Sequence, residues 1–223
     1  MGEGRGYSGV IFDLDGTLLD TLRDIAQAAN NVLRKFGYPD QPIDAYRYFV
    51  GNGVRVLFQR ALPEQHRDPA TVDACAVAFR ETYSRLWNVH TRPYAGVDEL
   101  LRSIVAIPLS MAVLSNKPHA FTELCVAEYL PKYDFRVVLG QREGVPQKPD
   151  PTGALEIAAQ LGLPPNRIVF VGDTAVDMQT AIAAGMLPVG VRWGFRPERE
   201  LIEAGAQSVL GEPAELLDLL GGQ

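Results

Sequence analysis

The sequence predicts an α/β protein, a doubly wound parallel sheet with a small, inserted α-helical cap. Two observations support this fold class. From residue 95 onward, apolar runs of strand length alternate with segments of helical periodicity, the pattern of repeated βα units. Residues 20–94 show helical patterns only, and they follow directly after the first strand-like run. We therefore expect an α/β core domain of residues 1–19 and 95–223 and an α-helical cap domain of residues 20–94.

The first predicted strand is the run of β-branched and aromatic side chains at 9–12, which ends at Asp13. A short run without polar alternation is typical of a strand buried on both faces, so we expect it near the centre of the sheet. Gly16 permits a tight turn soon after it. No strand is expected within the cap. Its helical patterns lie at 22–36, 54–61 and 72–86.

Helices and strands then alternate to the end of the chain. The expected helices lie at 98–106, 120–129, 151–161, just before Gly185, and at 213–220, and the expected strands lie at 109–114, 136–139, 168–171 and 187–191. Parallel strands joined by helices bring all their carboxyl ends to one edge of the sheet, where such folds bind their ligands.

Composition and charge exclude several classes of function. Apolar residues make up 47% of the 223-residue chain, and 21 basic against 27 acidic residues give a formal net charge of −6. That charge repels nucleic acid and anionic membranes, so neither is an expected partner. No apolar stretch approaches the roughly 18 residues of a membrane helix, and the two cysteines lack metal-ligand spacing. We expect a cytoplasmic protein, and the sequence indicates no oligomeric state.

Four polar motifs follow predicted strands in one order along the chain. They are Asp13-Leu14-Asp15-Gly16-Thr17, Ser115-Asn116-Lys117, Lys148-Pro149-Asp150-Pro151 and Gly172-Asp173-Thr174-Ala175-Val176-Asp177. A lone Asp-Gly-Thr is usually an ordinary turn. Because the sheet would bring all four motifs to the same edge, we interpret them together as one phosphoryl-transfer site.

The first motif supplies two carboxylates with different roles. A carboxylate at the end of a buried strand costs several kcal/mol unless a cation or a reaction compensates it. We therefore expect Asp13 to attack the phosphorus of a phosphate monoester and form an aspartyl-phosphate. Asp15 would protonate the leaving alcohol and later deprotonate the hydrolytic water. The turn at Gly16 and Thr17 would offer backbone N–H groups to the phosphate oxygens.

Asp173 and Asp177 are hard oxygen ligands suited to Mg²⁺, and Asp13 would complete the set. Such an ion would offset the repulsion between phosphate and the nucleophile, roughly 4 kcal/mol for unit charges about 4 Å apart. Asp173 could instead cap the helix that follows it, and the two roles are compatible because capping uses one oxygen. Asp177, one turn later, would be a weaker or indirect ligand.

The remaining candidates would bind phosphate. Lys148 brings positive charge to an acidic pocket on a loop stiffened by two prolines, although a single lysine is usually solvated. Ser115 can donate its hydroxyl to a phosphate oxygen, with Asn116 assisting, although Ser-Asn by itself is a common turn.

The four motifs, in this order, resemble those of the haloacid dehalogenase superfamily over roughly residues 8–210. This resemblance implies a Rossmann-like core in which Asp13 is the nucleophile, Asp15 is the acid/base whose backbone carbonyl also contacts Mg²⁺, and Asp173 is the remaining protein ligand. It further implies that Ser115 and Lys148 contact phosphate. Ser115 stands where the similar branch usually carries threonine, which keeps the hydroxyl.

The helical insert resembles the cap of the phosphoglycolate phosphatase-like branch. The residues that carry this likeness lie at 50–57 and in Trp193-Gly194-Phe195. The branch implies hydrolysis of 2-phosphoglycolate to glycolate and phosphate. The loop with Asn52 could close over the site, and Arg55 could bind a substrate carboxylate, because guanidinium groups pair bidentately with carboxylates. A glycine-rich helix connection with a solvated Arg55 explains the same residues.

Three alternative functions fit the same residues less well. A sugar-phosphate phosphotransferase or mutase would keep the aspartyl-phosphate and exclude water, and a pyrophosphatase would cleave a different substrate on the same fold. A phospho-acceptor signalling domain also combines acidic residues, a hydroxyl and a lysine on a doubly wound sheet. Such a domain needs no large helical insert, and its acceptor belongs on a middle strand of the chain.

Overall fold

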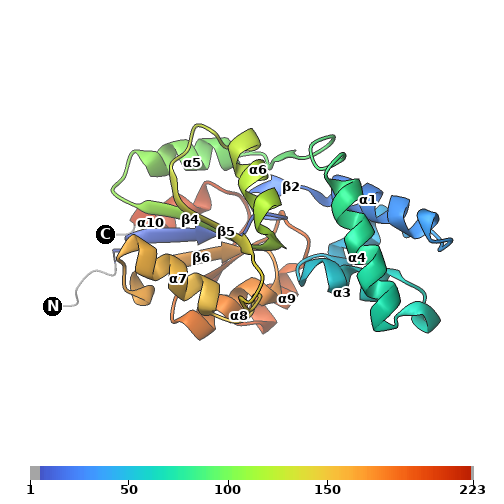
Figure 1. The fold of residues 1–223 in the computed structure, drawn as a ribbon. Coiled ribbons are helices and arrows are strands. Elements are labelled where there is room, and N and C mark those ends of the chain that lie inside the picture. Colours follow the sequence, from blue (N-terminus) through green and yellow to red (C-terminus); the bar gives the residue numbers. More distant parts are fainter. Residues whose placement is uncertain (1–5, 222–223) are drawn as a thin grey trace.

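The computed structural model describes residues 6–221 and shows a parallel sheet between helices, with a helical cap beyond one end of the sheet (Figure 1). Within these residues the main sheet has six parallel strands in the order β5-β4-β1-β6-β7-β8. They are β1 (Gly9–Phe12), β4 (Ser110–Pro118), β5 (Phe135–Gln141), β6 (Ile168–Gly172), β7 (Leu187–Val191) and β8 (Ser208–Leu210). The predicted fold class is confirmed.

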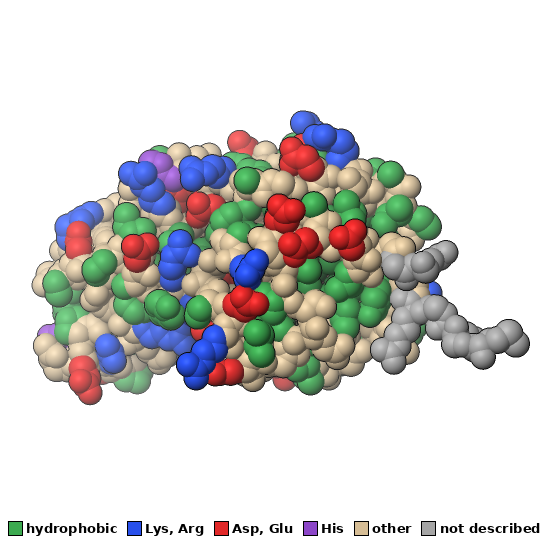
Figure 2. Space-filling model, turned by 180° about the vertical axis from the view of Figure 1, so that it is seen from behind, with side chains coloured by type: hydrophobic (Ala, Val, Ile, Leu, Met, Phe, Trp, Pro, Cys, Tyr) green, Lys and Arg blue, Asp and Glu red, His purple; other side chains and the backbone are tan. Residues whose placement is uncertain are grey.

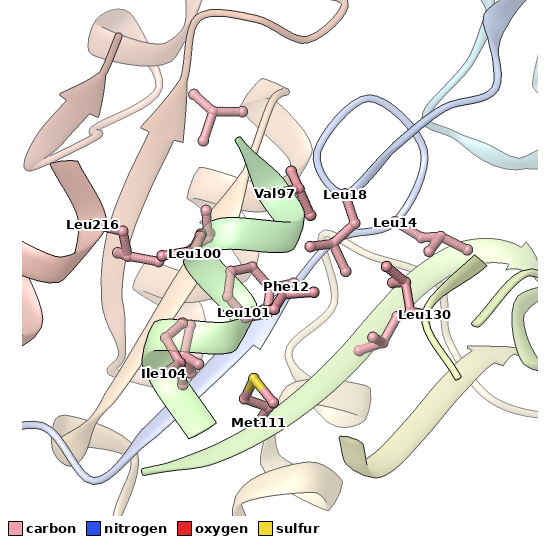
Figure 3. Close-up of a cluster of buried hydrophobic side chains, with 14 of the residues drawn as sticks. Phe12, Leu14, Leu18, Val97, Leu100, Leu101, Ile104, Met111, Leu130 and Leu216 are labelled. Carbon is pink, nitrogen blue, oxygen red and sulfur yellow. The ribbon is translucent and has the colours of Figure 1, made fainter. Parts of the chain in front are cut away.

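Strand β1 lies in the middle of the sheet, as its uninterrupted apolar run predicts. Phe12 pairs with Val113 of β4 on one side and with Val171 of β6 on the other. Val10 and Phe12 point into one hydrophobic core and Ile11 points into another, so the strand is buried on both faces. Figure 3 shows the first of these cores, in which β1 and β4 pack against a helix.

Helices cover both faces of the sheet (Figure 1). One core is closed by α5, α6 and α10, and the other is closed by α7 and α8, with α9 beside α8. These helices are α5 (Val97–Val105), α6 (His119–Tyr129), α7 (Thr152–Leu161), α8 (Ala175–Ala184), α9 (Glu198–Glu203) and α10 (Glu215–Gly221). Each of the helices packed on the sheet buries its apolar face against it.

The cap helices pack around a hydrophobic core of their own. They are α1 (Leu22–Lys35), α2 (Tyr46–Phe49), α3 (Gly53–Ala61) and α4 (Pro69–Tyr83), with short 3₁₀ helices at Ile43–Ala45 and Glu64–His66. Local sequence fixes their ends. The Asp68 side chain accepts a hydrogen bond from the backbone N–H of Thr71, with Pro69 as the first helical residue of α4. Gly37, at a φ of 79°, follows the end of α1.

Two very short strands connect the cap to the core. β2 (Leu19–Asp20) and β3 (Arg92–Pro93) pair antiparallel where the chain enters and leaves the cap. The expectation of no strand within residues 20–94 is therefore wrong, because two-residue strands show no measurable periodicity. Beside them, the buried Asp24 carboxylate accepts hydrogen bonds from the backbone N–H groups of His90 and Thr91 and from the Thr91 hydroxyl.

The structure also differs from the prediction in the length of one strand. β4 runs on to Pro118 and therefore contains the second motif, which we expected to follow the strand. The short elements α2, α9 and β8 were not predicted, because each has only three to six residues. The main helices and strands that were expected are all present.

The surface carries both signs of charge. Figure 2 shows acidic and basic side chains interspersed among apolar ones on one face of the molecule. No helix in the described part of the chain is both long and apolar enough to span a membrane.

Candidate active site

The carboxyl ends of three neighbouring strands bring the motifs together below the cap. Asp13 directly follows β1, Ser115 lies within β4, and Asp173 directly follows β6. Because β1 lies between β4 and β6, these residues occupy one edge of the sheet. The backbone N–H of Asp13 donates to the carbonyl of Val171 at 2.9 Å, which fixes the Asp13 backbone against β6.

Three buried carboxylates form the centre of this edge. Asp13, Asp173 and Asp177 each offer one oxygen, and these oxygens lie within 4.8 Å of one another. Asp13 Oδ1 is buried and accepts no hydrogen bond from the described residues. Buried like charges are costly unless a cation compensates them, and carboxylate oxygens are the ligands that Mg²⁺ prefers. The residues present therefore fit a magnesium ion.

Burial changes the protonation of this cluster when it holds no ion. Burial raises the pKa of Asp13 to about 7; the positive charge of Lys148 opposes the change and the charge of Asp177 adds to it. Burial also raises the pKa of Asp173 well above its usual value, with a further contribution from Asp13. Without an ion, these carboxyl groups would thus bind protons more readily than usual, and a cation would displace those protons.

Asp173 is held by contacts from two distant parts of the core. The Thr17 hydroxyl donates to its Oδ1 at 3.3 Å, and the backbone N–H of Phe195 donates to its Oδ2 at 2.7 Å. Gly16 and Gly194 leave the room that this carboxylate needs, since a Cβ at either position would come within 2.3 Å of an Asp173 atom. The role of Phe195 was not predicted, because a backbone donor leaves no signal in the sequence.

Lys148 lies among the carboxylates. Its Nζ is 2.6 Å from Asp177 Oδ1 and 2.9 Å from Asp13 Oδ1, and it donates to the Leu114 carbonyl at 3.0 Å. The contact with Asp13 is an ion pair whose angles lie outside hydrogen-bond geometry. Burial lowers the pKa of Lys148, but the two carboxylates outweigh this effect, so the ammonium remains charged. The alternative of a solvated Lys148 is therefore contradicted, since the residue is buried.

Asp177 has two structural partners in addition to its place in the cluster. Its Oδ1 accepts the hydrogen bond from Lys148, and its Oδ2 accepts from the backbone N–H and the hydroxyl of Thr174. Thr174 and Asp177 form the capping box of α8. The residue that caps this helix is therefore Thr174, and the alternative that Asp173 caps it is wrong.

The Asp15 carboxylate lies beside Lys117, a residue of the second motif for which no role was predicted. Lys117 Nζ is 2.9 Å from Asp15 Oδ1 and 3.2 Å from Oδ2, and it donates to the Tyr83 hydroxyl at 2.8 Å. Tyr83 is the last residue of cap helix α4. This contact was not predictable, because Tyr83 lies 34 positions away and fits the apolar stripe of its helix.

Ser115 and Asn116 differ in what they can offer a phosphate. Ser115 lies in the cavity wall, and its oxygen accepts a hydrogen bond from the Lys117 backbone at 3.2 Å, which leaves its proton available. The Asn116 side chain donates to the carbonyls of Gly51 and Lys148 and accepts from the Lys148 N–H, at 2.9–3.0 Å. Asn116 therefore connects β4 to the loop that carries Lys148 and to the cap, and its side-chain amide is occupied by these contacts.

The turn after β1 is bonded to itself. The backbone N–H of Gly16 donates to the Leu19 carbonyl, and that of Thr17 donates to the Leu14 carbonyl. The expectation that these two N–H groups are free for phosphate is therefore contradicted. In a turn this tight, the backbone N–H groups bond to carbonyls of the same turn, as those of Thr17, Leu18 and Leu19 do to the Leu14 carbonyl. Gly16 and Thr17 instead shape the pocket around Asp173.

Cap and core enclose a cavity of about 60 Å³ above the carboxylates. The core lines it with Asp13, Asp15, Ser115, Asn116, Lys117, Pro118 and Lys148, and the cap lines it with Ile25, Val50, Gly51, Gly53, Val54, Leu57, Phe79 and Tyr83. The cap wall is thus mostly apolar. Arg55 is ion-paired with Asp73, and neither Arg55 nor Asn52 is among the lining residues, so the structure does not bring these two predicted residues to the cavity.

An aspartate nucleophile candidate, three buried carboxylates that could hold a metal ion, and a buried lysine lie at the carboxyl edge of a capped α/β sheet, an arrangement that suits a phosphoric monoester hydrolase. The comparisons with known proteins agree. The family model for haloacid dehalogenase-like hydrolases matches residues 10–191. The chain belongs to this family, and because its relatives are enzymes, the signalling alternative is not supported.

The proteins to which the chain is similar include several phosphoglycolate phosphatases. It is 32% identical to the phosphoglycolate phosphatase of Pseudomonas putida over 212 residues, covering 93% of this chain and 78% of that protein. It is 31% identical to that of Psychrobacter arcticus over 218 residues, covering 95% and 94%. The crystal structure of a predicted phosphoglycolate phosphatase from Haemophilus somnus matches with a TM-score of 0.88 and 26% identity, covering 98% and 99%.

Proposed function

We propose that this enzyme is a Mg²⁺-dependent phosphatase that acts through an aspartyl-phosphate on Asp13, with 2-phosphoglycolate as substrate. The observation that carries the proposal is the buried Asp13 carboxylate, which directly follows the central strand, lines the half-open cavity between cap and core and lies 2.9 Å from Lys148. In this proposal residues 1–19 and 95–223 form the catalytic core, and residues 20–94 form the cap that encloses the substrate.

In the first half of the reaction, an Asp13 oxygen attacks phosphorus and the bond between phosphorus and the alcohol oxygen breaks. Asp15 gives its proton to the departing alcohol. In the second half, water attacks the aspartyl-phosphate, Asp15 accepts the proton, and the bond between phosphorus and Asp13 breaks to release phosphate. Ser115 donates its hydroxyl to a phosphate oxygen, and Lys148 supplies positive charge to the same oxygens.

Charge neutralisation explains the proposed metal requirement. Two unit negative charges about 4 Å apart repel by roughly 4 kcal/mol at an effective dielectric constant of 20, which corresponds to about a thousandfold in rate. Lys148 alone faces both Asp13 and Asp177 and does not neutralise this site. A bound Mg²⁺ would supply the missing positive charge, held by Asp13, Asp173 and the Asp15 backbone carbonyl, with Asp177 acting indirectly through Lys148 and Thr174.

The small cavity and the relatives support 2-phosphoglycolate. A cavity of about 60 Å³ suits a short leaving group better than a sugar. The cap offers the substrate carboxylate no lysine or arginine among the described lining residues, so recognition would depend on the core side and on backbone groups. A phosphotransferase, mutase or pyrophosphatase would use the same aspartyl-phosphate and differ only in acceptor or substrate.

The test measures phosphate release from 2-phosphoglycolate, a sugar monophosphate and pyrophosphate, with Mg²⁺ and with a chelator. We expect metal-dependent release that Asp13→Asn abolishes while the fold is kept, and labelled phosphate trapped on Asp13. Asp134→Asn is the matched control, because Asp134 is exposed and pairs only with Arg136. Full activity in folded Asp13→Asn protein would refute the mechanism, and isomerisation without phosphate release would indicate a mutase.

A further inference from the structure

Lys117 is a buried cation that the proposed chemistry does not use. Its side chain is 3% exposed, and its Nζ lies within hydrogen-bond distance of both Asp15 oxygens and of the Tyr83 hydroxyl. It also lies 4.7 Å from the centre of the Tyr83 ring. The Lys117 ammonium thus faces Asp15 and the cap, whereas the Lys148 ammonium faces Asp13 and Asp177.

The three groups come from separate parts of the molecule. Asp15 lies in the turn after the central strand, Lys117 lies in β4, and Tyr83 ends helix α4 of the cap. The Tyr83 ring stacks on Phe79 of the cap and meets the edge of Phe121 in core helix α6. The ring is thus fixed at the boundary between cap and core, and its hydroxyl reaches Lys117 across that boundary.

The Lys117 contact fixes the direction of the Asp15 carboxylate. Both Asp15 oxygens face one ammonium group, so the carboxylate plane is set by where Lys117 Nζ lies. The position of Nζ depends in turn on the third partner, Tyr83, because a lysine side chain is otherwise flexible. If the cap moved away, Lys117 would lose this partner and Asp15 would lose its fixed direction.

Resting on the proposed function, we infer that Lys117 is a positioning residue that directs Asp15 toward the leaving oxygen, and that it does so fully only when the Tyr83 hydroxyl of the closed cap contacts it. Proton delivery to the leaving group is thereby linked to cap closure. The inference assigns Lys117 to the acid step and not to phosphate binding.

The leaving group provides the test. An alkyl phosphate such as 2-phosphoglycolate releases a strongly basic oxygen that needs the Asp15 proton. Acetyl phosphate, of similar size, releases acetate, which departs without one. Rapid mixing with labelled substrate and acid quenching measures the first phosphoryl transfer to Asp13 in a single turnover. The variants are Lys117→Met and Tyr83→Phe, with Asp15→Asn as the reference for complete loss of the acid.

We expect Lys117→Met to slow transfer from 2-phosphoglycolate by about 100-fold and transfer from acetyl phosphate by less than about threefold, since general acid catalysis contributes roughly 10²–10⁴. Tyr83→Phe, which keeps the ring, should show the same selectivity with a loss of about 10-fold. Tyr46→Phe is the matched control, because that buried cap hydroxyl donates only to Asn30 at 2.7 Å. It should change neither rate.

The possible outcomes separate the two proposals. Equal slowing with both substrates in folded Lys117→Met protein, or no slowing with either, would overturn the role of Lys117. Tyr83→Phe gives an independent answer if Lys117→Met does not fold, and a loss without selectivity there overturns the link to the cap. Wild-type enzyme that forms no phosphoryl-enzyme from either substrate contradicts the proposed function itself, and the inference falls with it.

Discussion

Among the described glycines, Gly16 leaves the least room for a side chain. Its φ is 92°, and a Cβ built there would lie 2.2 Å from Asp173 Oδ2. We predict that Gly16→Ala displaces Asp173, lowers Mg²⁺-dependent turnover at least about 100-fold and lowers the free energy of unfolding by more than about 2 kcal/mol, from strain and overpacking together. Turnover at increasing Mg²⁺ and urea unfolding measure the two effects.

The matched control for this change is Gly144→Ala. Gly144 also has a positive φ, 75°, but a Cβ there would meet nothing within 4 Å. It should show only the backbone cost, about 1 kcal/mol, with turnover unchanged. Near-normal Mg²⁺ dependence in Gly16→Ala would show that Asp173 tolerates displacement.

The raised pKa of Asp13 predicts how stability responds to pH without metal. An Asp13 pKa of about 7 in the folded protein, against an ordinary value of 3.8, means that the folded state binds the extra proton between these values. The contribution of Asp13 to the free energy of unfolding therefore falls as pH rises through this window, by about 1.4 kcal/mol for each pKa unit. Asp13→Asn should lack this contribution.

Thermal unfolding in chelator measures this effect as the Tm difference between Asp13→Asn and wild type. From about pH 5 to about pH 8 the difference should widen in favour of the variant by several degrees. Mg²⁺ competes with the proton, so it should stabilise wild type more at the higher pH. A difference that is constant with pH would mean that Asp13 is ionised in the folded protein throughout.

The sequence predicts single residues well where the backbone alone places them. Asp13 and Asp173 each follow a buried strand, so periodicity is enough to bring them to one edge. Lys117 and Phe195 were missed, because their roles depend on contacts made by a distant cap helix and by a backbone N–H. Arg55 illustrates the opposite error, since its chemistry suited a carboxylate but the fold pairs it with Asp73.

Long helices and strands were predicted from the sequence more accurately than short ones. Helices of nine residues or more and the apolar strands of the sheet were predicted, because each contains at least one full period of its pattern, although α8 was predicted only by its end before Gly185. β2 and β3 have two residues each, and their pairing depends on the cap returning to the core. β4 was predicted too short, because Ser115, Asn116 and Lys117 near its end are polar. Asn116 bonds to the Gly51 carbonyl of the cap and Lys117 bonds to Asp15, so these residues do not continue the apolar pattern of the strand.

The loop that carries Lys148 has no regular secondary structure and is held in place by a side chain of β4. The Asn116 side chain, in β4, bonds both backbone polar groups of Lys148 and the Gly51 carbonyl of the cap. The Asn116 side-chain amide thus fixes the position of the Lys148 backbone and the position of the cap loop at Gly51. Periodicity cannot predict this role of Asn116, because its three backbone partners are distant from it in the sequence.

For the whole molecule, the proposed function makes the cap the part that limits which leaving groups fit the cavity. It meets the core through Arg47, which donates to the Gly194 carbonyl at 2.9 Å, and through the buried Arg196, which donates to the Val50 carbonyl at 3.2 Å. These contacts lie beside the active site and hold the apolar cap wall over it. Under the proposed function, the core therefore supplies the chemistry and the cap selects the leaving group by its size.

This division predicts that trimming the cap wall changes selectivity without changing the chemistry. Val54, on α3, lines the cavity, and Val54→Ala would enlarge it by two methyl groups. The ratio of kcat/KM for glycerol phosphate to that for 2-phosphoglycolate should rise about 10-fold, the usual effect of one or two methyl-sized groups in a pocket. Val77→Ala is the control, since Val77 is an exposed valine on α4. A ratio that stays the same in Val54→Ala and Val77→Ala would mean that the cap wall does not contact the leaving group.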